Sequence, residues 1–397
     1  MSDETILPLS GVTVIDFTQV FMGPCATQML GDYGADVIKI EKVGTGDLSR
    51  TSLPGDPAGL QNPVFRSLNR NKRSIALDLK SEVGKDIVRK LVAQADVMVN
   101  NFRAGVMERM GFGYEEMAKI NPRIIHATGT GFGIEGPYAH KGGQDVLAQA
   151  LTGLMHRRST TTDPLSVYPT TLADYSAGMH LVQAILFALL QRDRTGQGQK
   201  VYVSLYDSVL AMQMQEAAMW LMRGVELNWG ALPLTGVFET SDGAVALVGG
   251  TFKPNPLRDI CIALEMDDLS AIERFSTFAK MVRNKAELQS RLRARFAQGT
   301  TARWIAGLEA QDMLCAPVRS MAAALEDPQT TINHMILQAE TGGEQLKVTG
   351  SPVHLTHGRL AVRRMPPTLG EHSDEILAEL GYDETARADA RRSGAVA

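Results

Sequence analysis

Cysteine is scarce in this chain. Cys25, Cys261 and Cys315 are the three cysteines among 397 residues; they lie far apart and their number is odd. This excludes a dense disulfide framework and is typical of proteins kept in a reducing compartment. The cysteines and the eight histidines show no cluster with metal-ligand spacing. We therefore expect a cytoplasmic protein without a metal site.

An excess of charge of one sign is also missing. The chain has 40 Lys and Arg against 44 Asp and Glu, a net charge of −4, so no strong basic field attracts nucleic acid or an anionic membrane. Residues 1–5 are acidic and lack the basic start and apolar core of a signal peptide. The apolar run over 179–190 is too short to span a membrane. We expect neither nucleic acid nor a membrane as a partner.

The chain contains regular α/β patterns, but its first strand–helix connection carries no Gly-x-Gly-x-x-Gly loop. Residues 11–17 are rich in β-branched and apolar side chains and predict a buried strand. A helix is predicted over 25–33, ending at Gly34, and a second strand over 37–41. A strand–helix–strand unit of this length implies a parallel sheet. Without the glycine motif in this connection, a classical dinucleotide site is not indicated there.

Polar residues follow two further predicted strands. The strand over 96–99 ends at Asn100 and Asn101, and the strand over 123–127 runs into the glycine-rich stretch 128–137. Open α/β sheets bind their ligands at the carboxyl ends of parallel strands. We therefore expect a ligand site at this edge of the sheet.

Two basic clusters allow two interpretations each. The run 70–73, Arg-Asn-Lys-Arg, follows a loop-rich segment, and such runs are usually solvated, although they can also contact phosphate. Arg157 and Arg158 precede a polar loop. They could receive a dicarboxylate through charge-assisted hydrogen bonds, but a solvated loop is the more common case.

The composition changes near residue 224. A hairpin is predicted over 236–248, and helical patterns follow at 254–265, 268–282, 285–297 and 301–311. We predict a large α/β domain with a parallel sheet over 1–224, a smaller α+β domain over 225–325, and a segment over 326–397 that returns to the large domain.

Asp174 stands directly before an apolar segment that predicts a buried helix. One interpretation is structural, because Asp is among the preferred helix-capping residues. The other is catalytic. Backbone N–H groups and the helix dipole would keep the carboxylate ionised, and an ionised carboxylate within reach of a substrate carbonyl is a nucleophile.

Motifs along nearly the whole chain resemble one family, the family III CoA-transferases, and occur in the same order. They lie at residues 9–17, 23–24, 34–41, 71–74, 77–78, 95–97, 101–102, 131–133, 136–137, 174–178, 195–199, 315–318 and 369–372. The family includes carboxylate CoA-transferases, among them formyl-CoA transferase, and α-methylacyl-CoA racemase.

The resemblance implies an interlocked homodimer with a Rossmann-like large domain and a small domain. It implies that Asp174 is the nucleophile, forming an aspartyl anhydride and then an aspartyl-CoA thioester. Acyl-CoA would be a substrate beside a small carboxylic acid, with no permanently bound cofactor. Family positions that contact CoA match Gln19, Val20, Phe21, Lys42, Leu77, Lys80, Asn101, Phe102, Arg109 and Lys141.

Three departures refine this expectation. Formyl-CoA transferase has a functional Gln where this chain has Phe21, and a multi-glycine loop where residues 228–233 contain one glycine, which suggests a different and larger acid. The racemases have Gly-His-Asp where this chain has Gly143-Gln144-Asp145.

An amide cannot act as a general base near neutral pH, so Gln144 favours a transferase, in which it would orient an acyl or carboxylate oxygen. A 2-methylacyl-CoA epimerase and a CoA-binding protein without turnover remain as alternatives. For the cations among the matched positions, Lys42, Lys80, Arg109 and Lys141, the alternative is an exposed charge that contributes little.

Overall fold

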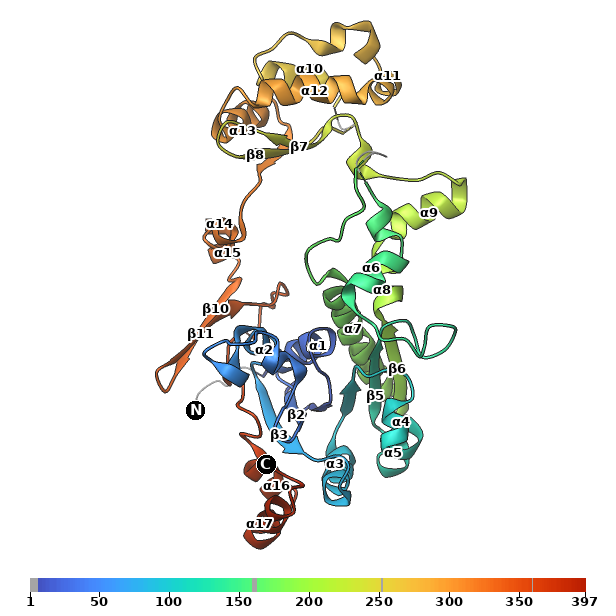
Figure 1. Cartoon of the computed structure of the whole chain (residues 1–397), viewed down its shortest axis with the longest axis vertical. Coiled ribbons are helices and arrows are strands. Elements are labelled where there is room, and N and C mark those ends of the chain that lie inside the picture. The colour runs from blue at the N-terminus through green and yellow to red at the C-terminus, as the bar shows by residue number, and fades with distance from the viewer. Residues whose placement is uncertain (1–5, 159–162, 251–252, 359) are drawn as a thin grey trace. The chain divides into compact units, whose positions relative to one another are not determined.

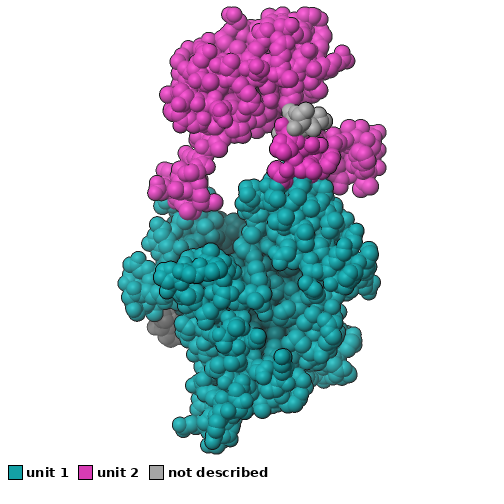
Figure 2. Space-filling model, viewed as in Figure 1, with its two compact units in different colours: residues 1–155, 167–214, 331–397 teal, residues 156–166, 215–330 magenta. Residues whose placement is uncertain are grey.

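The structure is a computed structural model that describes residues 6–158, 163–250, 253–358 and 360–397. Contacts divide the chain into two compact units (Figure 2). Unit 1 comprises residues 1–155, 167–214 and 331–397, and unit 2 comprises 156–166 and 215–330. The predicted boundaries at 224 and 325 both fall within unit 2.

Unit 1 is built on a sheet of six parallel strands in the order β3-β2-β1-β4-β5-β6 (Figure 1). This order, with a switch between β1 and β4, is that of a doubly wound fold and confirms the predicted α/β class with a parallel sheet. The strands are β1 (Thr13–Asp16), β2 (Asp36–Lys42), β3 (Lys72–Leu77), β4 (Val97–Asn100), β5 (Ile125–Thr130) and β6 (Gln199–Ser204).

Helices cover both faces of this sheet, because strand side chains alternate between two buried cores. Val14 and Val97 face one core, and the next residues, Ile15 and Met98, face the other. The first core is covered by α1 (Met22–Asp32), α6 (Asp145–Leu151), α7 (Leu172–Thr195) and α8 (Leu205–Met212). The second is covered by α3 (Glu82–Gln94), α4 (Val106–Met110), α5 (Tyr114–Ile120), α16 (Ser373–Glu379) and α17 (Glu384–Arg392).

Helix α7 is longer than predicted. Its 24 residues and their hydropathy of 1.3 meet the length and composition of a membrane span, which the predicted run over 179–190 does not. Buried helices of soluble proteins have the same character, and here Ala177, Leu181 and Ile185 lie fully buried in the core of unit 1. Packing on the sheet and α1 therefore explains the apolar residues on the buried face of α7.

The basic cluster at 70–73 is buried, so its interpretation as a solvated surface is wrong. Strand β3 begins at Lys72, inside the stretch predicted as loop, and carries the cluster into the sheet. Arg70 pairs with Asp32 at 2.6 Å, and Lys72 pairs with Asp16 at 3.2 Å. Fully buried charges of this kind persist only when they are paired.

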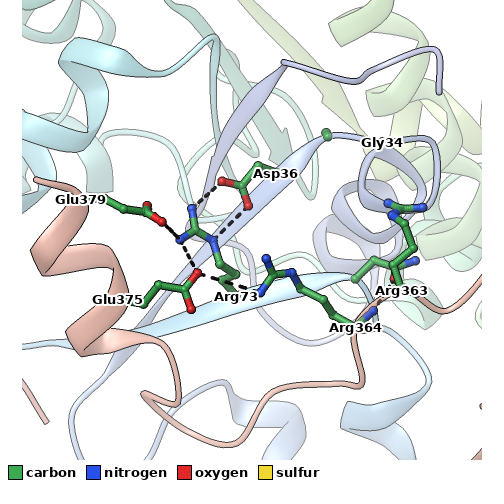
Figure 3. A pocket seen from close by; sticks show the side chains of 9 residues that line it. Gly34, Asp36, Arg73, Arg363, Arg364, Glu375 and Glu379 are labelled. Carbon is green, nitrogen blue, oxygen red and sulfur yellow. Dashed lines mark hydrogen bonds and ion pairs between the residues drawn. The ribbon is translucent and has the colours of Figure 1, made fainter. Parts of the chain in front are cut away.

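Arg73 joins the C-terminal part of the chain to the sheet (Figure 3). Its guanidinium donates to Asp36 at the start of β2 and to Glu375 and Glu379 of α16 at 3.0 and 2.8 Å. These groups line a polar cavity of about 280 Å³. The cavity lies at the amino ends of β2 and β3, the edge opposite the one where open sheets bind ligands.

The chain returns to unit 1 through an antiparallel hairpin, β10 (Ile336–Thr341) and β11 (Glu344–Thr349). Among the described residues from 350 to 372, none forms a strand. The short helix α2 (Pro63–Arg66) completes the regular elements of the described part of unit 1.

Unit 2 has an antiparallel sheet in the order β7-β8-β9 with helices packed on a separate core. The predicted hairpin is present, whereas residues 268–282 form two 3-10 turns and a short helix. Gln213 separates helix α9 from helix α8. The elements are α9 (Met214–Arg223), which starts at the unit boundary, β7 (Thr235–Glu239), β8 (Ala244–Val248), α10 (Pro256–Ala263), α11 (Phe278–Arg283), α12 (Lys285–Phe296), α13 (Thr301–Ala310), β9 (Leu314–Pro317), α14 (Met321–Leu325) and α15 (Pro328–Ile332).

Candidate active site

The loops after β1 and β4 meet at the switch point of the sheet. Asn101 follows β4, and its side chain clamps the backbone of Gln19, which follows β1. The amide of Asn101 accepts from Gln19 N–H at 2.9 Å and donates to Gln19 C=O at 2.8 Å. Gln19 and Asn101, which belong to two different motifs and are both predicted to contact CoA, are therefore neighbours in space. This crevice is where open α/β sheets bind their ligands.

The next residue in this loop, Val20, has a positive φ of 69°. A β-branched residue rarely adopts this conformation, and such strain persists only where the surroundings enforce it. Val20 N–H donates to Asp47 Oδ1 at 3.0 Å, and the ammonium of Lys39 pairs with the other Asp47 oxygen at 2.8 Å. Lys39 also donates to Thr18 C=O at 2.8 Å. The buried charges of Lys39 and Asp47 therefore fix this loop through hydrogen bonds to its backbone.

Close glycine contacts bring Gln144 to the carboxyl edge of β5. A Cβ on Gly131, just after β5, would lie 2.4 Å from the Cα of Gly143, so only glycine allows this approach of two backbones. Gln144 occupies the N-cap position of α6, where its carbonyl accepts from Leu147 and Ala148. Its exposed side chain makes no capping bond and is available to a ligand.

Asp174 lies in the first turn of α7 and does not cap it, so the capping interpretation is wrong. The helix begins two residues earlier, at Leu172. The cap comes from Asp145, the first residue of α6. Its Oδ2 accepts from the N–H groups of Ala173 and Asp174 at 2.7 and 3.0 Å. The sequence did not single out Asp145, because this partner is 29 residues away.

The electrostatic surroundings of Asp174 also differ from the expectation of a stabilised charge. Burial and, next, the nearby Asp145 raise the pKa of Asp174 to about 7. Both causes disfavour the ionised form. The Asp145 carboxylate already accepts from the N–H groups of Ala173 and Asp174 at the start of α7. The dipole of this helix does not offset the two effects that raise the pKa of Asp174.

Helix α1 crosses α7 one turn beyond Asp174. A Cβ on Gly178 would lie 2.8 Å from Met22 C=O, so glycine permits the close contact. Cys25 of α1 lies near this crossing, and burial raises the pKa of its thiol to about 11. The thiol is therefore neutral beside Asp174. At its start, α1 has no side-chain cap, so its first backbone N–H groups have no side-chain acceptor from the N-cap residue.

The remaining predicted contacts lie at the carboxyl ends of the strands, where Lys42 ends β2 and Leu77 ends β3, or on the loops and the short helix that follow them. Phe21 and Phe102 are half-buried, and Leu77 has its side chain in the core. The exposed cations are Lys42, Lys80, Arg109 and Lys141; Lys141 lies 4.2 Å above the ring of Tyr138.

Arg157 and Arg158 bond within unit 2. The guanidinium of Arg157 donates to Leu227 C=O at 2.9 Å, and the carbonyl of Arg158 accepts from Asn228 at 2.6 Å. Asn228 also caps the 3-10 turn Trp229–Ala231. The arginine loop and the stretch over 228–233 therefore support each other.

An open parallel sheet with fixed loops at its switch point and a desolvated carboxylate in the same unit is typical of an α/β enzyme. The chain belongs to CoA-transferase family III, whose model matches residues 9–373.

Relatives agree with this assignment. The chain is 36% identical to an acyl-CoA transferase of Fusarium pseudograminearum, over 98% of this chain and 88% of the relative. It is 35% identical to succinyl-CoA:glutarate CoA-transferase of Mus musculus, over 96% and 89%. A CAIB/BAIF family protein from Brucella suis has a similar structure, with a TM-score of 0.84 and 32% identity over 94% and 99% of the two chains.

Proposed function

We propose that this enzyme transfers CoA from an acyl-CoA to a free carboxylic acid, with Asp174 as the covalent nucleophile. An oxygen of Asp174 bonds to the thioester carbonyl carbon and the C–S bond breaks, which releases CoA thiolate and leaves a mixed anhydride. The thiolate attacks the aspartyl carbonyl, and the donor acid leaves as its carboxylate. The acceptor carboxylate then reverses both steps. Each step exchanges one acyl bond for another, without net proton transfer or redox change.

The observation that carries this proposal is the position of Asp174. Asp174 is half-buried and lies one helical turn from Gly178, which contacts Met22 at the uncapped start of α1, and we infer that backbone donors there stabilise a tetrahedral oxyanion. Burial also protects an anhydride from water. An ionised Asp174 in this place is poorly solvated and therefore reactive.

We infer that CoA lies along the carboxyl edge of the sheet. The strained loop at Val20 and the clamp between Gln19 and Asn101 hold a fixed backbone surface for it. The exposed cations after the strands suit the phosphates, because charge-assisted hydrogen bonds to phosphate are strong. Gln144 would orient the acyl group or the acceptor acid.

The acceptor is proposed to be a small dicarboxylate. The Mus musculus relative is named for succinyl-CoA and glutarate, and the single glycine in the stretch over 228–233 argues against the formyl and oxalyl pair.

Trapping the covalent intermediate tests the function. The enzyme is incubated with succinyl-CoA and, separately, with acetyl-CoA and formyl-CoA. Hydroxylamine is then added, and peptides are mapped by mass spectrometry. We expect a hydroxamate on the peptide that contains Asp174, because hydroxylamine cleaves aspartyl anhydrides and thioesters.

The matched control is Asp193→Asn, an exposed position on the same helix, which should label like the wild type, whereas Asp174→Ala should not label. Exchange of the α-proton of a 2-methylacyl-CoA without any adduct would instead establish an epimerase.

We also infer that two copies associate, as the family resemblance implies. Phe187 and Leu190 of α7 are 66% and 60% exposed, which is unusual for neighbouring large apolar side chains of a core helix. Phe187→Glu is expected to shift the protein toward a monomer in sedimentation velocity, and Asp193→Lys is the matched surface control. A monomeric wild type would contradict this inference.

A further inference from the structure

Two carboxylates share the junction of α6 and α7. Asp145 is buried and has a partner for each oxygen: Oδ2 accepts from Ala173 and Asp174, and Oδ1 accepts from the Gln149 amide at 2.6 Å. Three N–H donors thus hold this carboxylate in one position. Asp174 accepts no hydrogen bond from the residues that the structure describes.

Gln149 fixes this arrangement from one helical turn further along α6. Its side chain is completely buried. Its Oε1 accepts from Tyr168 N–H at 3.0 Å, and its Nε2 donates to Tyr168 C=O at 3.2 Å as well as to Asp145. One amide therefore holds α6, the segment that leads into α7, and the Asp145 carboxylate in register.

Other groups near Asp174 do not counter the charge of Asp145. Cys25 comes from α1 and is neutral, because burial raises its pKa to about 11. Tyr175 is the neighbour on α7 itself, and burial also raises the pKa of its hydroxyl. Among the described residues, the charge that acts on Asp174 is thus the like charge of Asp145.

We propose that Asp145, held by Gln149, is a positioning residue whose fixed negative charge drives Asp174 into its acylated states. The inference rests on the proposed function. Before attack, ionised Asp174 repels Asp145 at close range. When the oxygen of Asp174 bonds to the acyl carbon and the C–S bond breaks, the electron pair leaves with the CoA thiolate. Acylated Asp174 is neutral, so the repulsion is present in the reactant and absent in both covalent intermediates.

The negative charge of Asp145 also affects a second quantity that can be measured separately, the pKa of Asp174. A like charge that favours the acylated form also favours the protonated form, because both are neutral. The free energy that raises the pKa of Asp174 is therefore the free energy that favours the intermediate, and one pKa unit corresponds to a tenfold change in either equilibrium.

Asp145→Asn tests the inference, since an amide oxygen can still accept from the two N–H groups of α7 while the charge is removed. We expect the acid limb of the kcat/KM profile to move down by about one pH unit. The fraction of enzyme trapped as aspartyl adduct should fall about tenfold. The pH dependence of stability, measured by urea unfolding between pH 4 and 8, should shift the same way without any turnover.

Gln149→Met provides a second variant, in which the side chain keeps its length but loses the donor to Asp145. This variant should move the acid limb of the kcat/KM profile in the same direction as Asp145→Asn, but by a smaller amount. Gln183→Met, at an exposed position of α7, is the matched control and should leave it unchanged.

A wild type that forms no adduct overturns the proposed function. A wild type that forms one while Asp145→Asn keeps the same adduct fraction and pH profile overturns this inference alone.

Discussion

Replacing Asp174 with Asn is expected to abolish CoA transfer and to stabilise the fold at the same time. The amide has no anionic oxygen to attack a thioester, so kcat should fall by roughly 10⁴-fold or more, as for other enzymes that lose their nucleophile. The rate is measured with succinyl-CoA and glutarate near pH 8. Binding of CoA should persist, because its proposed contacts do not include this carboxylate.

The stabilisation follows from the raised pKa. The unfolded chain releases the Asp174 proton near its ordinary value of 3.8, and the folded chain releases it near 7. Between these values the folded state binds more protons, so rising pH lowers stability. Above pH 7 the full cost is present, and Asp174→Asn should raise the free energy of unfolding by about 2–4 kcal/mol there. Below pH 4 the difference should vanish.

Asp193→Asn is the matched control for this experiment, because Asp193 lies on the same helix but is exposed. It should leave both rate and stability unchanged. A variant Asp174→Asn that loses activity without gaining stability at pH 8 would show that the carboxylate is not strained in the folded state.

The sequence predicted the part of the fold that depends on local patterns. The strand at 13–16, the helix after it and the polar ends of β4 and β5 all follow from periodicity and turn residues. The edge of the sheet that carries the site follows from the parallel topology. The candidate nucleophile itself came from the resemblance, since an Asp before an apolar helix is by itself ambiguous.

What the sequence missed depends on contacts between distant residues. The start of α7 was misplaced because its cap, Asp145, comes from another helix. The raised pKa of Asp174 has the same origin, together with burial. The run 70–73 was taken as a loop because a strand that buries Arg and Lys is recognisable only when their acidic partners are known. These partners, Asp16 on β1 and Asp32 on α1, are far from residues 70–73 in the sequence.

These buried partners connect stability to the site. Asp16 Oδ1 accepts from the N–H and hydroxyl of Thr18 at 2.8 and 2.5 Å, and Oδ2 accepts from Thr27 and Lys72 at 2.7 and 3.2 Å. Thr18 begins the loop that continues into Gln19. A change in the Asp16 pair should therefore affect both the folding of unit 1 and the shape of the proposed CoA surface.

Lys72→Met is the substitution expected to cost the most stability. The ammonium of Lys72 is fully buried and bonds to Asp16, Thr27, Asn69 and the carbonyl of Pro24. Removing one partner of a buried ion pair leaves the other charge uncompensated, which typically costs 3–5 kcal/mol. We expect a loss of about 3 kcal/mol in urea unfolding and a higher KM for acyl-CoA, because the loop at Thr18 loses its support.

Two further variants separate charge from packing. Lys80→Met changes an exposed lysine and should alter stability by less than about 0.5 kcal/mol. The double variant Asp16→Asn/Lys72→Met removes both charges but keeps an acceptor for Thr18, so it should recover much of the lost stability. Because Lys39 also lies near Asp16, the recovery should be incomplete. A double variant no more stable than Lys72→Met would mean that the loss came from packing around the lysine stem and not from an unpaired carboxylate.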